Sequence, residues 1–111
     1  MRRALQPAED IYGYLAAVKA RPEMYIGDPG SADALKSLET LICGYEVALF
    51  AHDIQETHDG RTFTREAFGR WLWETRGWST ALGITHEISQ QGTPKDAFRL
   101  FFELIDEFRN S

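Results

Sequence analysis

The sequence predicts an all-α fold, in the form of a compact single domain of about five helices. Apolar residues recur at spacings of three and four in several segments, and no two segments show the alternation that a secure strand pair would need. The chain has 111 residues, of which 43% are apolar and 13% aromatic, enough for one domain with its own core. We expect residues 1–8 to form a flexible N-terminus and residues 9–109 to form the helical domain.

The first helix is predicted over residues 9–20. Ile11, Leu15 and Val18 recur at helical spacing, and the acidic side chain of Asp10 favours a helix start. Pro22 ends this helix, because the residue before a proline avoids the helical conformation.

The longest helix is predicted over residues 32–52. Ser31 is its expected N-cap, and Asp33 would lie in its first turn. A single stripe follows the whole helix and consists of Leu35, Leu38, Ile42, Tyr45, Leu49 and His52. Such a stripe is expected to face the core or, in an alternative that stays open, a second copy of the chain.

A third helix is predicted over residues 65–76. Thr64 is the expected N-cap, and Gly77 is expected to end the helix. Its predicted buried face consists of Phe68, Trp71, Leu72 and Thr75.

The pattern of residues 79–91 fits two structures. Positions 82, 84, 86 and 88 alternate like a strand, whereas positions 78, 82, 85 and 88 have helical spacing. We predict a helix, because Ser79 offers an N-cap and Gly92 offers a C-terminal stop.

The last helix has the clearest start. Thr93 is the expected N-cap, Pro94 takes the first helical position, and Asp96 lies in the first turn. Its apolar face contains Phe98, Phe101, Phe102, Ile105 and Phe108.

Charge and composition indicate which kinds of partner and which cellular compartment to expect. The net charge is −5, from 17 acidic and 12 basic side chains, so we expect no direct nucleic-acid partner and favour a basic protein. A single cysteine excludes an internal disulfide framework and suits a reducing compartment. No apolar run reaches the ~18 residues of a membrane helix and no secretion signal is recognisable, so we expect a cytoplasmic protein without a membrane partner.

Motifs of catalysis are missing from the sequence. It contains no phosphate-binding loop, no nucleophile elbow and no His-Glu-x-x-His zinc motif. Cys43 flanks the apolar stripe and is expected to be an inert, partly buried thiol. We therefore expect no enzyme, no catalytic residue, no metal and no cofactor.

The segment from His52 to Asp59 contains two histidines and three carboxylates. It is the only local cluster of candidate metal ligands, although its spacing matches no standard site. A solvated acidic loop is the favoured interpretation, and an acidic contact surface is the alternative.

Three further side chains have unusual positions. Trp73 projects away from the apolar face of its helix, so it is either covered by another helix or part of a protein interface. Glu39 and Glu46 lie at the edge of the stripe of the 32–52 helix, where a half-buried carboxylate needs a partner. Arg21 is the expected partner.

A short segment resembles a known nucleotide-binding domain. Residues 17–28, which include Arg21, Pro22, Met24, Tyr25, Ile26 and Gly27, resemble the N-terminal motif of the ATPase domain of DNA gyrase B subunits. That family binds ATP and magnesium through a Glu-x-x-x-Asn motif on the next helix, where this sequence has Glu39 and Cys43. The resemblance leaves a degenerate nucleotide-binding module, with Tyr25 to Gly27 near the ligand, as an alternative. A rigid connector between two helices is the favoured interpretation of the segment.

A second resemblance covers most of residues 17–108. The sequence resembles small bacterial polymorphic-toxin immunity proteins in three features. These are the Arg21–Gly27 segment, the Gly44-Tyr45 and Gly77-Trp78 pairs, and the acidic, Phe-rich last helix. The resemblance implies a cytosolic protein that binds one cognate toxin and blocks its active site or substrate path.

The leading functional expectation is therefore an immunity protein that neutralises a toxin, such as a basic nuclease or another enzyme with a cationic cleft. An all-α dimerising scaffold is a further alternative, so both a monomer and a dimer stay open. The candidate partner-binding residues are exposed acids and one tryptophan: Asp53, Glu56, Asp59, Trp73, Glu103, Asp106 and Glu107.

Overall fold

The computed structural model describes residues 10–111, and in this part of the chain it is an all-α single domain without strands. The predicted fold class is therefore confirmed, whereas the prediction for residues 1–8 lies outside the described residues. In chain order the elements are α1 (Ile11–Ala20), the short 3-10 helix η2 (Pro22–Met24), α2 (Ala34–Ala51), α3 (Arg65–Arg76), α4 (His86–Ser89) and α5 (Pro94–Arg109).

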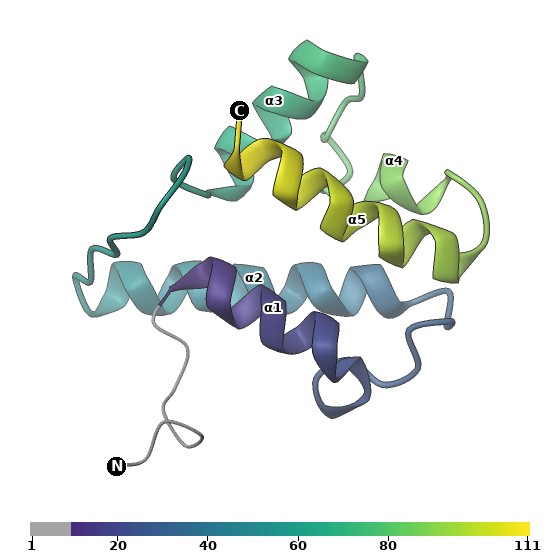
Figure 1. Ribbon diagram of the computed structural model, residues 1–111, viewed down its shortest axis with the longest axis horizontal. Helices are drawn as coiled ribbons and strands as arrows, with labels where there is room; N and C mark the ends of the chain where they lie inside the picture. Colours follow the sequence, from purple (N-terminus) through teal and green to yellow (C-terminus); the bar gives the residue numbers. More distant parts are fainter. Residues whose placement is uncertain (1–9) are drawn as a thin grey trace.

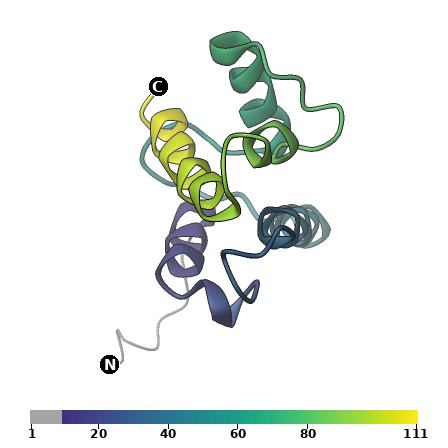
Figure 2. The same cartoon turned by 90° about the vertical axis from the view of Figure 1, so that its right-hand side faces the viewer.

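Helix α2 is the base on which the other helices are arranged (Figure 1). Helix α1 lies beside α2, α5 packs on α2 and on α4, and α3 lies farthest from α1 (Figures 1 and 2). Viewed nearly along its axis, α2 has α1 on one side and α4 with residues 77–85 on another (Figure 2).

The core is built around aromatic side chains from α3 and α5. Phe68 of α3 packs edge-to-face with Phe101 and Phe108 of α5, at ring-centroid distances of 6.1 and 5.5 Å, and all three are fully buried. Leu15 and Val18 of α1 are buried in the same cluster. Burial of one such phenyl ring stabilises the fold by about 3–5 kcal/mol relative to alanine.

Local sequence signals correctly predict both ends of α3 and the start of α5. The Thr64 hydroxyl accepts a hydrogen bond from the N–H of Ala67, and Gly77 ends α3 in the left-handed conformation, with φ of 71°. Thr93 and Asp96 form a capping box, since each side chain accepts a hydrogen bond from the backbone N–H of the other. These three predictions are confirmed.

The predicted start of the long helix is wrong by two residues. The N-cap of α2 is Asp33, not Ser31, and its side chain makes no capping hydrogen bond. The Ser31 hydroxyl instead accepts a hydrogen bond from the N–H of Asp33, two residues on, in a local turn.

The stripe of α2 is buried only over its first half. Leu35, Leu38 and Ile42 are covered by the chain's own helices, whereas Leu49 is half-buried and His52 is exposed. The C-terminal part of α2 extends past the core. The apolar stripe therefore continues along the sequence beyond the last described helix that could cover it.

The predicted helix over residues 79–91 is largely wrong. Only His86–Ser89 are helical, and residues 77–85 form an irregular segment. The Ser79 hydroxyl accepts from the N–H of Ala81 in a turn instead of capping a helix, and α4 ends before Gly92. Thr75, predicted on the buried face of α3, is also exposed.

Over residues 10–111, no helix is both long enough and apolar enough to cross a membrane.

Candidate functional site

Three hollows lie in series along one side of α2 and together form a groove. Their volumes are about 400, 430 and 390 Å³. The first and second share Glu39 and Arg65, and the second and third share Glu46 and Thr64. We call this row of adjoining hollows the α2 groove. Its opposite wall is formed by residues 80–89 and by the start of α3.

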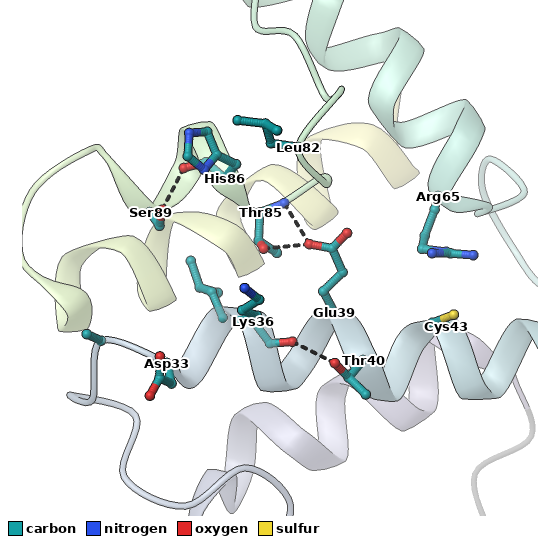
Figure 3. A pocket seen from close by; sticks show the side chains of 12 residues that line it. Asp33, Lys36, Glu39, Thr40, Cys43, Arg65, Leu82, Thr85, His86 and Ser89 are labelled. Atoms are coloured by element: carbon teal, nitrogen blue, oxygen red, sulfur yellow. Dashed lines mark hydrogen bonds between the residues drawn. The ribbon is translucent and has the colours of Figure 1, made fainter.

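The first hollow is bounded by α2 below and by α4 with its preceding loop above (Figure 3). Lys36, Glu39 and Cys43 project into it from α2, and Leu82 and His86 face them from the other wall (Figure 3). The side chain of Leu82 is 75% exposed, so this end of the groove has an apolar side chain with no cover.

Glu39 fixes the upper wall of the first hollow. Its carboxylate accepts hydrogen bonds from the N–H groups of Ile84 and Thr85, at 3.0 and 3.2 Å, and from the Thr85 hydroxyl at 2.6 Å (Figure 3). Gly83 lies directly against this carboxylate, and a Cβ there would come within 2.7 Å of it. The Glu39 side chain therefore ties this loop to α2, in addition to the burial of Ile84 in the core.

Glu46 and Arg65 join α2 to α3 at the middle of the groove. The guanidinium Nε of Arg65 lies 3.0 Å from Glu46, and the backbone N–H of Arg65 donates to the same carboxylate at 2.7 Å. The hydrogen bond to Glu46 raises the pKa of the Arg65 guanidinium, so this guanidinium stays charged. Arg65 and Cys43 both line the first hollow (Figure 3).

The far end of the groove is formed where α2 ends. Asp53 has a positive φ of 51°, its N–H donates to the Phe50 carbonyl, and the N–H of Ile54 donates to the Leu49 carbonyl. This is a Schellman motif, which turns Ile54 back against the last turn of α2. Phe50, which is 88% exposed, and Ile54 line the third hollow together with Asp53.

Acidic side chains predominate along the groove. Among residues 10–111, five carboxylates and two permanent cations, Lys36 and Arg65, line it. The carboxylates are Asp33, Glu39, Glu46, Asp53 and Glu66. The excess of three negative charges is more than half of the chain's net charge of −5. The groove thus combines a negative lining with an exposed apolar side chain at each end.

The three acids predicted in the loop after α2, Asp53, Glu56 and Asp59, lie in three different environments. Glu56 is half-buried and accepts hydrogen bonds from the N–H of Ile11, at 3.1 Å, and from the Tyr45 hydroxyl. Asp59 is exposed, and its carbonyl accepts from the Arg109 guanidinium at 3.0 Å. Only Asp53 of the three predicted acids lies in the α2 groove.

His58 in the same loop is buried. Its side chain is 4% exposed, its ring packs edge-on to Tyr12, and Nδ1 lies 4.0 Å from a carboxylate oxygen of Asp10. Within residues 10–111, no group of three or more His, Cys, Asp or Glu side chains is arranged to hold a metal ion.

The other predicted partner-binding residues lie outside the groove. Trp73 is 61% exposed on α3, so no helix of the described chain covers it. Glu103, Asp106 and Glu107 are all exposed on α5. Glu107 pairs with Arg76 of α3 at 3.1 Å, and this arginine also covers the ring of Trp71.

The segment Arg21–Gly27 connects α1 to α2. Pro22 begins η2, and its carbonyl accepts from the N–H groups of Tyr25 and Ile26. Ile26 packs against the core, Met24 is exposed, and Tyr25 packs edge-on to Tyr14, which stacks on Tyr45.

The expected pairing of Arg21 with Glu39 or Glu46 is wrong. The Arg21 guanidinium lies against the Met24 sulfur, while the two carboxylates face the opposite wall of the groove. Helix α1, which precedes Arg21, lies on a different side of α2 from α4 and residues 77–85 (Figure 2).

Sequence reasoning missed Phe50 and Leu82 as the apolar ends of the site. A signal for Phe50 was present, since Val47 and Phe50 are apolar residues that lie off the stripe of α2. No local signal exists for Leu82, because its exposure depends on an irregular loop held by a residue far away in the sequence.

A comparison with known protein families, with curated proteins and with solved structures finds no match to this chain.

Proposed function

We propose that this chain is an immunity protein that binds a cognate bacterial toxin and neutralises it. The observation that supports the proposal best is the α2 groove, because its acidic lining and exposed apolar ends are the chemistry of a protein-docking site. The resemblance of residues 17–108 to immunity proteins points the same way.

The proposed mechanism is occlusion without catalysis. Toxins that act on nucleic acids present cationic clefts, and an acidic surface is attracted to such a cleft. Exposed aromatic and aliphatic side chains such as Phe50 would supply the apolar contact that slows dissociation. The bound toxin then cannot admit its substrate.

Survival of bacteria tests the proposal directly. The C-terminal domain encoded by the gene immediately upstream is expressed with and without this protein, and colonies are counted. We expect killing by that domain alone and survival when both are present. Killing that this protein does not relieve would contradict the proposal for that pair.

The electrostatic part of the mechanism has its own test. The association rate of the two purified proteins is expected to fall as ionic strength rises, because salt screens the attraction between an acidic and a basic surface. An association rate that is independent of salt would remove the acidic surface from the mechanism and leave apolar contact as its basis.

A further inference from the structure

We infer that the α2 groove binds a basic, extended segment of the partner protein, with one apolar side chain anchored at each end. The partner's identity as a toxin rests on the proposed function, but the chemistry of the segment follows from the groove itself. Three features carry the inference: the two apolar ends, the distance between them and the charge along the path.

The two ends of the groove offer separate apolar contacts. Leu82 projects at the first hollow, and Phe50 with Ile54 lines the third. Between them the lining is polar, with Thr40, Thr64 and the Glu46–Arg65 pair. A ligand that is apolar along its whole length would leave these polar groups without partners, which is unfavourable.

The spacing of the ends sets the length of the segment. Glu39, which holds the loop that carries Leu82, and Phe50 are eleven positions apart on the single helix α2. At the helical rise this is roughly 17 Å. An extended polypeptide covers the same distance in about five steps, so a segment of about six residues connects the two ends.

The charge along the groove selects a basic segment. The carboxylates of Asp53 and Glu66 are exposed, and neither Asp33 nor Asp53 has a cationic partner within residues 10–111. Within residues 10–111, the hydrogen bonds that Glu39 accepts come from uncharged N–H and O–H groups, and it forms no salt bridge. Lysine or arginine side chains between the two anchors would be attracted to these groups.

Binding of synthetic peptides to the full chain tests the inference. The probe has about six residues, with leucine at both ends and two lysines between them. One control peptide has glutamate in place of lysine, and another has the same composition with the two leucines adjacent. Fluorescence anisotropy gives the affinity, and the rate of Cys43 alkylation reports occupancy, because this single thiol lies inside the groove.

We expect the lysine peptide to bind at least ~10-fold more tightly than either control and to slow alkylation of Cys43. Phe50→Ser and Leu82→Ser should each weaken binding by roughly 10-fold, since each removes one apolar anchor. Met24→Ser is the control, because it removes another exposed apolar side chain, one that lies outside the groove. Its affinity should equal that of the unmodified chain.

Three results would overturn the inference. They are the absence of binding at millimolar lysine peptide, equal binding of the glutamate or rearranged peptide, and protection of Cys43 that increases with protein concentration without any peptide. The last result would assign the groove to a second copy of the chain. Equal loss of binding with Met24→Ser would also overturn it, by placing the site elsewhere.

Survival of cells separates this inference from the proposed function. If the unmodified chain and the Phe50→Ser/Leu82→Ser variant protect cells equally, the inference about the groove is wrong and the immunity function stands. If the unmodified chain gives no protection but the lysine peptide binds as expected, the inference about the groove stands and the immunity function fails.

Discussion

Glu56 accepts a hydrogen bond from the hydroxyl of Tyr45 on α2, although eleven residues separate the two in the chain. The other oxygen of the Glu56 carboxylate accepts from the N–H of Ile11 at the start of α1. One side chain of the α2–α3 connection therefore ties together two helices that lie side by side (Figure 1). This contact turns a loop that looks solvated in the sequence into part of the fold.

Replacing Glu56 by alanine should therefore destabilise the protein. Two partly buried donors lose a charged acceptor, and we expect the free energy of unfolding to fall by about 2 kcal/mol. Asp59→Ala is the matched control on the same loop, where the exposed carboxylate should contribute less than about 0.5 kcal/mol. Urea unfolding of the two variants measures the difference. Equal stability of both variants would contradict the role of Glu56.

Glu39→Gln should loosen residues 80–89 while leaving the helices in place. The glutamine amide keeps one acceptor oxygen but turns its NH₂ group toward the donors of either Ile84 or Thr85, so about 1–3 kcal/mol of stabilisation is lost. Hydrogen exchange should accelerate at these two amides. Thr40→Ala, on the neighbouring exposed position of α2, is the control and should leave their exchange unchanged.

The stability of the fold should decline at alkaline pH. Burial raises the pKa of the Tyr12 hydroxyl from 10.0 to about 12, and burial with the Glu56 hydrogen bond raises the pKa of Tyr45 as well. Folding therefore favours the neutral phenols. Their contribution is complete below pH 10 and is lost as the pH rises through the folded-state values.

Urea unfolding over a range of pH values measures this loss. Tyr12→Phe should show a shallower decline above pH 10 than the unmodified chain, because the variant lacks the hydroxyl that ionises. An unchanged decline in the Tyr12→Phe variant would exclude Tyr12 as a cause.

Asp53→Gly should separate stability from binding. Glycine adopts the positive φ of the Schellman position without steric cost, so the free energy of unfolding should rise by about 0.5–1 kcal/mol. The same change removes a groove carboxylate, so the affinity for a basic peptide should fall. Asp53→Asn is the control: it should weaken binding in the same way but leave stability nearly unchanged, because asparagine tolerates this conformation.

Phe50→Ser should leave the fold intact. The ring is 88% exposed, so the change in the free energy of unfolding should stay within about 0.5 kcal/mol. Phe101→Ala, in the fully buried cluster, should cost about 3–5 kcal/mol. Thermal unfolding distinguishes the two. A large loss with Phe50→Ser would mean that this ring belongs to the core and cannot serve as a free anchor.

Features of the fold that depend on neighbouring residues could be predicted from the sequence. The Thr93–Asp96 capping box and the Gly77 end of α3 each involve residues within a few positions of one another. The 79–91 segment could not be predicted, because the Glu39 carboxylate, 45 residues before Ile84, binds N–H groups that a helix would have used.

Most of the candidate site could not be predicted from the sequence, for a related reason. Asp53 was predicted as a contact residue, but the exposure of Phe50 depends on where the core ends along α2, not on the periodicity of α2 itself. In the same way, the sequence shows Glu56 as one acid in a polar loop. Its partners, Ile11 and Tyr45, become neighbours only when α1 packs beside α2.

The segment from Glu56 to Arg61 fastens the start of α1 and the end of α5 at once. Besides the bond from Ile11 to Glu56, the backbone N–H of Arg61 donates to the Arg109 carbonyl at 2.9 Å, and its guanidinium donates to the Ser111 hydroxyl at 3.0 Å. We therefore expect a mechanical load on either end of the described chain to act first on these three hydrogen bonds. Glu56 lies two positions after Ile54, so we expect a load applied at Arg109 or Ser111 to strain the apolar end of the groove as well. A reporter inserted in the exposed turn at residues 90–92 would avoid that strain.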